Sequence, residues 1–263
     1  MTARNILIRG LLAGFIAGLA AFCVGNLVGE TQVDAAIAVE ESHAASEAPP
    51  ADTHDETTAG HSHEEDGTVV SRTNQKTWGL ATGTIASGTA LGGLVALVAA
   101  SLIGRIGKFS PRAATLLVSL LGFVAVSFVP FLKYPATPPA VGNEDTIGSR
   151  TGLFFGFMLI SIVAAVAAVA LAQHLLKTRG GFQAVVIACA AYLLVVVVVG
   201  QVMPTVNEIG DFPADTLWYF RRASLLTLGT MWAVLGVVLA ALVGRLHEQQ
   251  TGTAARRDLA RAL

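Results

Sequence analysis

Charged residues are scarce in this 263-residue sequence, and its longest apolar stretches contain none. Only 13% of the residues are Asp, Glu, Lys or Arg, against about 25% in a typical soluble domain. None of the 17 basic or 18 acidic residues falls within Gly10–Gly29, Gly79–Gly104, Ala113–Leu132, Gly152–Leu176, Gly181–Asn207 or Ala223–Gly244. Each stretch is about 20 residues or longer, which is enough helix to cross a hydrocarbon core of roughly 30 Å. The sequence therefore predicts an all-α, polytopic membrane helix bundle with six transmembrane helices.

Other absences narrow the class of protein. Cys23 and Cys189 both lie inside predicted helices, so we expect no disulfide framework. The predicted helices carry no nucleophile paired with a base, so we expect no enzyme. They also lack the mid-span Asp, Glu or His that proton-coupled carriers usually use. No nucleotide-binding motif is present, and we expect no nucleic-acid partner.

The basic residues predict an orientation. Arg4 and Arg9 precede the first helix, and placing that side in the cytoplasm puts 11 of the 17 basic residues inside. The outer face then receives 16 of the 18 acidic residues and four of the six histidines. Both termini are therefore predicted to be cytoplasmic, in a multi-pass membrane protein. The predicted regions are an N-terminus with the first helix (1–29), an outer loop (30–77), a five-helix bundle (78–244) and a cytoplasmic tail (245–263).

The outer loop 30–77 is rich in acidic and small residues, so we expect it to be mostly disordered. Its densest metal-ligand cluster comprises His54, Asp55, Glu56, His61, His63, Glu64, Glu65 and Asp66. Imidazole and carboxylate together suit Co²⁺, Ni²⁺, Zn²⁺ or Cu²⁺. Two interpretations stay open: a weak capture site for a metal ion, or a solvated acidic linker.

Two predicted outer loops, 133–150 and 204–222, repeat one order of elements. Each has a proline at the helix exit (Pro130, Pro204), an Asn-Glu pair, and an Asp-Thr pair followed by an arginine (Arg150, Arg221). In a structural interpretation, the aspartates cap the outgoing helices and pair with the arginines. In a binding interpretation, oxygen ligands converge at the outer mouth and attract a divalent cation; they are Asn143, Glu144, Asp145, Asn207, Glu208, Asp211 and Asp215.

Glycines recur at four-residue spacing in several predicted helices. They are Gly10, Gly14 and Gly18, then Gly88 and Gly92, then Gly148, Gly152 and Gly156. This spacing places small residues on one helical face, where the backbones of two helices can approach closely. We expect these faces to pack against neighbouring helices.

Three strings carry a family resemblance. YPATPPAVGNEDTIGSRT (134–151), NEIGDFPADTLWYFR (207–221) and RGLLAGFIAG (9–18) resemble the CbtA-type predicted cobalt transporter subunit. The resemblance implies cobalt import across the bacterial cytoplasmic (inner) membrane, together with a small single-span subunit that has a histidine-rich end. It implies no permanently bound cofactor, with Co²⁺ (or Ni²⁺ or Zn²⁺) as the transported ion. The histidines of the outer loop are a departure that would substitute for those of the partner.

We therefore expect an integral membrane subunit of a divalent-metal uptake system, with the outer loop concentrating the ion. The alternative is a non-transporting membrane subunit for metal sensing or assembly.

Overall fold

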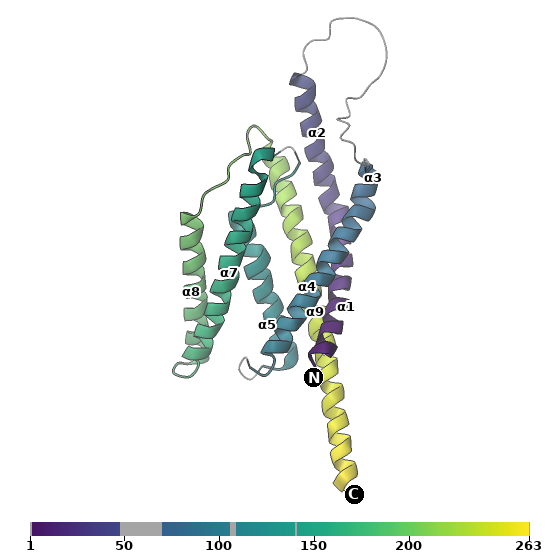
Figure 1. Ribbon diagram of the computed structural model, residues 1–263, viewed down its shortest axis with the longest axis vertical. Helices are drawn as coiled ribbons and strands as arrows, with labels where there is room; N and C mark the ends of the chain where they lie inside the picture. The colour runs from purple at the N-terminus through teal and green to yellow at the C-terminus, as the bar shows by residue number, and fades with distance from the viewer. Residues whose placement is uncertain (1, 48–69, 106–108, 140, 263) are drawn as a thin grey trace, which may run out of the picture.

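The computed structural model describes residues 2–47, 70–105, 109–139 and 141–262, and in these ranges it contains helices and loops but no strand. Six helices are long and apolar enough to cross a membrane. They are Ala3–His43, Arg72–Leu102, Pro111–Lys133, Ile147–Leu175, Gly181–Val202 and Ala214–Thr253. These helices run roughly alongside one another (Figure 1). The predicted fold class and the number of membrane-crossing helices are confirmed.

Wide π-helical turns interrupt the first three of these helices. The first consists of α1 (Ala3–Val24), η1 (Gly25–Gly29) and α2 (Glu30–Glu47). The second consists of α3 (Arg72–Asn74), η2 (Gln75–Gly79) and α4 (Leu80–Leu102). The third consists of α5 (Pro111–Gly122), η3 (Phe123–Phe128) and α6 (Val129–Lys133). A short 3-10 turn η4 (Glu144–Thr146) precedes α7 (Ile147–Leu175), and α8 (Gly181–Val202) and α9 (Ala214–Ala262) follow.

Both ends of the predicted disordered loop differ from the expectation, because they are helical. The first helix continues past Gly29 as α2, through Glu47. At the other end, the Ser71 hydroxyl accepts a hydrogen bond from the Asn74 N–H at 3.4 Å and caps α3. The alanine-rich composition of α2 favours helix, and ion pairs to α3 hold it in place. The predicted metal-ligand cluster of residues 54–66 lies outside the described residues.

Glycines bring α1 and α4 into close contact, so both of these glycine faces pack against a neighbouring helix as predicted. A Cβ added to Gly14 would collide with the Gly88 carbonyl oxygen, and one added to Gly92 would collide with the Gly10 carbonyl oxygen. Such interlocked backbones are a common way of joining helices in a membrane.

The glycine face of α7 differs from its expectation. Apart from the adjoining residues and the nearby backbone of α7 itself, no described atom lies within 4 Å of the place where a Cβ would stand on Gly148, Gly152 or Gly156. The predicted packing of this face is therefore not found within the described part of the chain. Helix α7 instead contacts α8 through another face, where the Ser161 and Tyr192 hydroxyls lie 2.8 Å apart.

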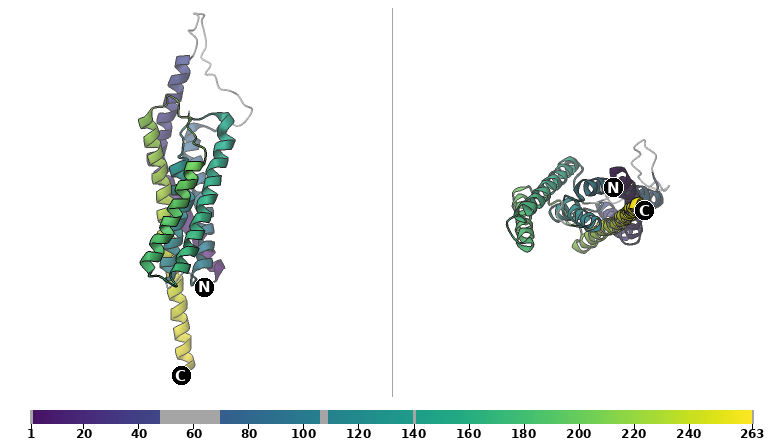
Figure 2. Two further views of the ribbon diagram at one scale, coloured as in Figure 1. Left: turned by 90° about the vertical axis from the view of Figure 1, so that its left-hand side faces the viewer. Right: turned by 90° about the horizontal axis from the view of Figure 1, so that it is seen from below.

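The helices form two groups. Helices α1, α4, α5 and α9 enclose the main core, which includes Val118, Trp232, Leu235 and Leu239. The α7–α8 pair lies to one side of this core (Figure 2). A smaller cluster that includes Val129, Tyr134, Phe157 and Val196 joins this pair to the third helix.

The start of α1 and the end of α9 lie at the same end of the bundle (Figure 1). Helix α3, the far end of α2 and the two matched loops lie at the opposite end, which we call the matched-loop end. Because the described part of the structure has an even number of membrane-crossing helices, both chain ends lie on the same side of the membrane. That this side faces the cytoplasm stays a prediction.

Candidate functional site at the matched-loop end

Glu208 joins the two matched loops to each other. Its Oε2 accepts a hydrogen bond from the Asn143 backbone N–H at 3.0 Å and another from the Thr146 hydroxyl at 2.9 Å. Arg150 Nε lies 3.6 Å from the same oxygen. The Asn143 and Thr146 hydrogen bonds, with a further contribution from the Arg150 charge, lower the pKa of Glu208 below its usual value despite partial burial. Glu208 therefore stays ionised at neutral pH while it connects the loops.

The arginines of the repeated motif do not pair with the aspartates as the structural interpretation predicted. Arg150 instead contacts Glu208 of the other loop, and Arg221 Nε donates to the Ala136 carbonyl at 3.4 Å. Each arginine thus reaches across to the other loop. Sequence spacing within one loop could not predict this, because the acceptors lie about 60 residues or more away along the chain.

The aspartates also differ from the predicted helix caps. Thr146 occupies the N-cap position of α7, and its side chain forms no capping hydrogen bond. The backbone N–H of Asp145 donates to the Asn143 side-chain oxygen at 3.1 Å. Asp215 lies within the first turn of α9, where its carboxylate accepts from the Thr216 N–H at 2.8 Å and favours the positive end of the helix.

The two prolines occupy different places. Pro204 follows the end of α8, as predicted, whereas Pro130 lies inside the third helix at the start of α6. The two matched loops nevertheless contact each other close to Pro204. The Tyr134 hydroxyl donates to the Pro204 carbonyl at 2.8 Å, and Lys133 Nζ donates to the Met203 carbonyl at 3.2 Å.

Five of the predicted outer-mouth residues have exposed side chains: Asn143, Asp145, Asn207, Asp211 and Asp215. Glu208 is partly buried, and the side chain of Glu144 lies outside what the structure describes. Among the described residues, no group of three His, Cys, Asp or Glu side chains is placed to hold a metal ion. The described motif residues thus tie the loops together without forming a ready-made ligand cage.

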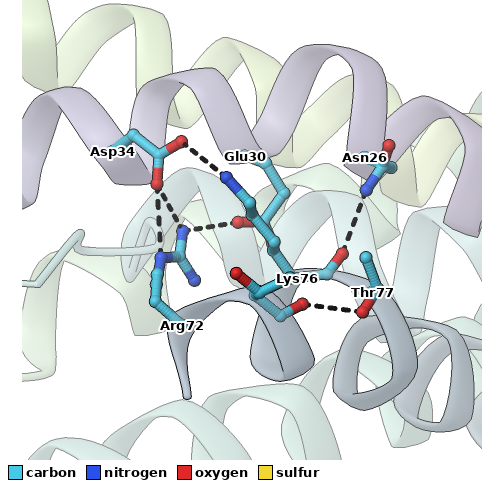
Figure 3. Close-up of polar contacts among 7 residues, drawn as sticks. Asn26, Glu30, Asp34, Arg72, Lys76 and Thr77 are labelled. Atoms are coloured by element: carbon cyan, nitrogen blue, oxygen red, sulfur yellow. Dashed lines mark hydrogen bonds and ion pairs between the residues drawn. The ribbon is translucent and has the colours of Figure 1, made fainter.

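A second polar cluster links α2 to α3 (Figure 3). Arg72 forms ion pairs with Glu30 and with Asp34. Its Nη2 lies 2.9 Å from Asp34 Oδ1. Lys76 Nζ lies 3.7 Å from the other Asp34 oxygen. The Asn26 amide donates to the Lys76 carbonyl at 3.0 Å. Glu30 and Asp34 are four residues apart on one helix, so both face α3.

The sequence analysis did not single out Glu30. A signal was present, because Glu30 is the first charge after a long uncharged stretch, and Arg72 and Lys76 are the only basic residues in 30–77.

A cavity of about 730 Å³, which we call the end cavity, lies between these two clusters. The π-helical turn η1 and helices α2, α4, α6, α7 and α9 contribute to it, as do both matched loops. Its lining is mainly apolar and includes Leu80, Phe131, Phe154, Phe155 and Phe220. Its charged lining residues are Glu30, Lys133, Arg150, Glu208 and Arg221. The end cavity is thus an apolar pocket with two carboxylates and three basic groups.

Six membrane-crossing helices, with a partly charged cavity at one end of the bundle, define a polytopic membrane protein. The family model described as a probable cobalt transporter subunit (CbtA) matches residues 3–244. The chain belongs to the CbtA family, which confirms the resemblance seen in the loop strings. Neither the curated proteins nor the solved structures that were compared give a match.

Proposed function

We propose that this chain is the bacterial inner-membrane subunit that moves Co²⁺, or a similar divalent metal, inward through the end cavity. The supporting observation is that both loop strings that resemble CbtA line this cavity and are joined there by Glu208. A divalent ion must lose water to cross a membrane, and a partly apolar pocket with ionised carboxylates suits that step.

Glu30 and Glu208 are the described carboxylates that line the end cavity. Each already has an arginine partner, Arg72 for Glu30 and Arg150 for Glu208. A metal ion would therefore compete with a tethered guanidinium for these oxygens. Competition of this kind favours brief, reversible binding, which transport requires, over tight retention.

The outer segment that carries His54, His61 and His63 concentrates the ion in this proposal. The Arg72 ion pairs hold the two helical ends of that segment together beside Glu30. A captured ion would then be released close to a lining residue of the end cavity. The membrane potential can drive the inward step, because it supplies about 2.3 kcal/mol per charge per 100 mV. A single-span histidine-rich subunit remains a proposed partner.

Accumulation of radioactive cobalt in cells that lack their own cobalt uptake tests this proposal. Wild type should accumulate cobalt, alone or together with the partner subunit. Glu30→Gln and Glu208→Gln should accumulate less at the same membrane abundance, because each loses a lining charge. Glu40→Gln changes an exposed acid on α2 and serves as the matched control. If wild type never exceeds cells without the chain, the alternative of a sensing or assembly subunit replaces transport.

A further inference from the structure

We propose that the end cavity binds the phosphate group of an anionic phospholipid. Lys133 and Arg221 both line it, and neither forms an ion pair with any acid in the described ranges. Lys133 Nζ donates to the Met203 carbonyl and lies 5.5 Å from the centre of the Tyr134 ring. Arg221 donates to the Ala136 carbonyl. Within the part of the chain that the structure describes, both positive charges thus have only neutral partners.

The two lining carboxylates do not balance these charges, because other residues already engage them. Glu30 pairs with Arg72, which does not line the cavity, and Glu208 pairs with Arg150. Lys133 and Arg221 remain as surplus positive charge beside a mainly apolar wall. A charge in such surroundings is costly without a counter-ion, so the cavity favours an anion.

The walls indicate that this anion is part of an amphiphile. Aromatic and aliphatic side chains from α4, α6, α7 and α9 make up most of the lining. A free phosphate ion would satisfy the basic groups but would leave this apolar surface uncovered. A phospholipid supplies both parts, with phosphate oxygens for Lys133 and Arg221 and an acyl chain for the wall.

The cavity also lies at the level where lipid head groups are expected. Trp78 and Trp218 have exposed side chains at the matched-loop ends of their helices, and Tyr219 is exposed beside Trp218. Exposed Trp and Tyr at helix ends mark the interface between hydrocarbon and head groups. The lining residues Leu80 and Arg221 follow Trp78 and Trp218 by two and three positions, respectively.

This inference goes beyond cobalt transport and has a consequence for it. Bound phosphate would neutralise the surplus positive charge that otherwise repels a metal ion from Glu30 and Glu208. Lipid binding is measured without transport, so either proposal can fail while the other stands.

The test is native mass spectrometry of the purified full chain, titrated with phosphatidylglycerol, phosphatidylcholine or inorganic phosphate. Wild type should retain phosphatidylglycerol in clear preference to phosphatidylcholine. The double variant Lys133→Gln/Arg221→Gln should bind phosphatidylglycerol at least about tenfold more weakly, since each basic residue near a membrane surface contributes about 1 kcal/mol. Lys133→Arg/Arg221→Lys keeps both charges and should restore binding, which separates loss of charge from loss of fold.

Arg222→Gln is the matched control, because Arg222 neighbours Arg221, is exposed over the Tyr219 ring and does not line the cavity. It should bind phosphatidylglycerol like wild type. Equal retention of the two lipids would overturn the proposal, as would equal binding by the double variant and Arg222→Gln. Displacement of phosphatidylglycerol by an equal concentration of inorganic phosphate would assign the site to a free anion instead.

Discussion

The Glu208 carboxylate accepts a hydrogen bond from the Asn143 backbone N–H, 65 residues earlier in the chain, at 3.0 Å. Both residues belong to Asn-Glu pairs of the repeated loop motif, yet they act differently. The first loop contributes the donor, from its backbone, and the second contributes the acceptor, from a side chain. The repeat therefore produces an asymmetric connection between the loops at the edge of the end cavity. We call the hydrogen bonds of Glu208 to Asn143 and Thr146 the lock.

Breaking this lock should loosen the first loop. Glu208→Ala removes the acceptor for Asn143 and Thr146, so hydrogen exchange of the amides in residues 141–146 should become several-fold faster. Asp211→Ala alters an exposed acid in the same loop and should leave exchange unchanged. Exchange measured by mass spectrometry checks both variants. Equal rates in Glu208→Ala and Asp211→Ala would show that the lock does not hold the loop.

The same lock should depend on pH. The pKa of Glu208 is lowered in the folded protein, so its stabilising effect is complete above the ordinary Glu value of about 4.3. The effect is lost as pH falls through the lower folded value, because the protonated side chain loses its charge. Amide exchange in residues 141–146, corrected for its intrinsic pH dependence, should therefore rise only below about pH 4. A rise centred near pH 6 would contradict this assignment.

The glycine contacts predict opposite results for two similar substitutions. Gly88→Leu should lower the free energy of unfolding by about 1–3 kcal/mol or more, because its side chain would meet the backbone of α1 at Gly14 and Gly18. Gly152→Leu should change it little, since no described atom lies near that position. Thermal unfolding in detergent measures both. Equal destabilisation would mean that the α7 glycine face is packed in the purified protein.

The sequence was sufficient to predict the helices, because a run of 20 apolar residues leaves the backbone few alternatives in a membrane. It also predicted that the glycine faces of the first and second helices pack closely, but not that they pack against each other. It could not predict the partners of Arg150, Arg221 and Glu208, which depend on how distant loops meet. Helix α2 was missed because composition alone did not reveal the ion pairs between Glu30, Asp34 and Arg72. The packing of α7 was overpredicted, since glycine spacing permits close approach without requiring it.

The outer histidines give a prediction for metal capture. The purified chain should bind Co²⁺, Ni²⁺ or Zn²⁺, and affinity should fall as pH drops through the histidine range, because protonated imidazole cannot bind a metal. Replacing His54, His61 and His63 by alanine should weaken binding and reduce uptake mainly at low external metal. Titration calorimetry compares the two proteins. Identical heats of metal binding for wild type and the triple variant would show that this segment is only an acidic linker.

The orientation is tested with a reporter that is active only in the cytoplasm. Fusion after Leu263 or within Arg105–Arg112 should give activity, and fusion within residues 45–65 should give none. Activity from the latter fusion would reverse the orientation and remove the outer segment from metal capture.

The most direct test of the end cavity as the metal route is to block the cavity chemically at Ser224, one of its lining residues. Cys23 and Cys189 are first replaced by alanine, and Ser224→Cys is then modified with a bulky, membrane-impermeant thiol reagent. Ser149→Cys, at an exposed position outside the cavity lining, is the control. With labelling of both cysteines confirmed by mass, radioactive cobalt uptake should fall strongly for Ser224→Cys and stay unchanged for Ser149→Cys. Undiminished uptake through fully labelled Ser224→Cys would contradict passage of the metal through the end cavity.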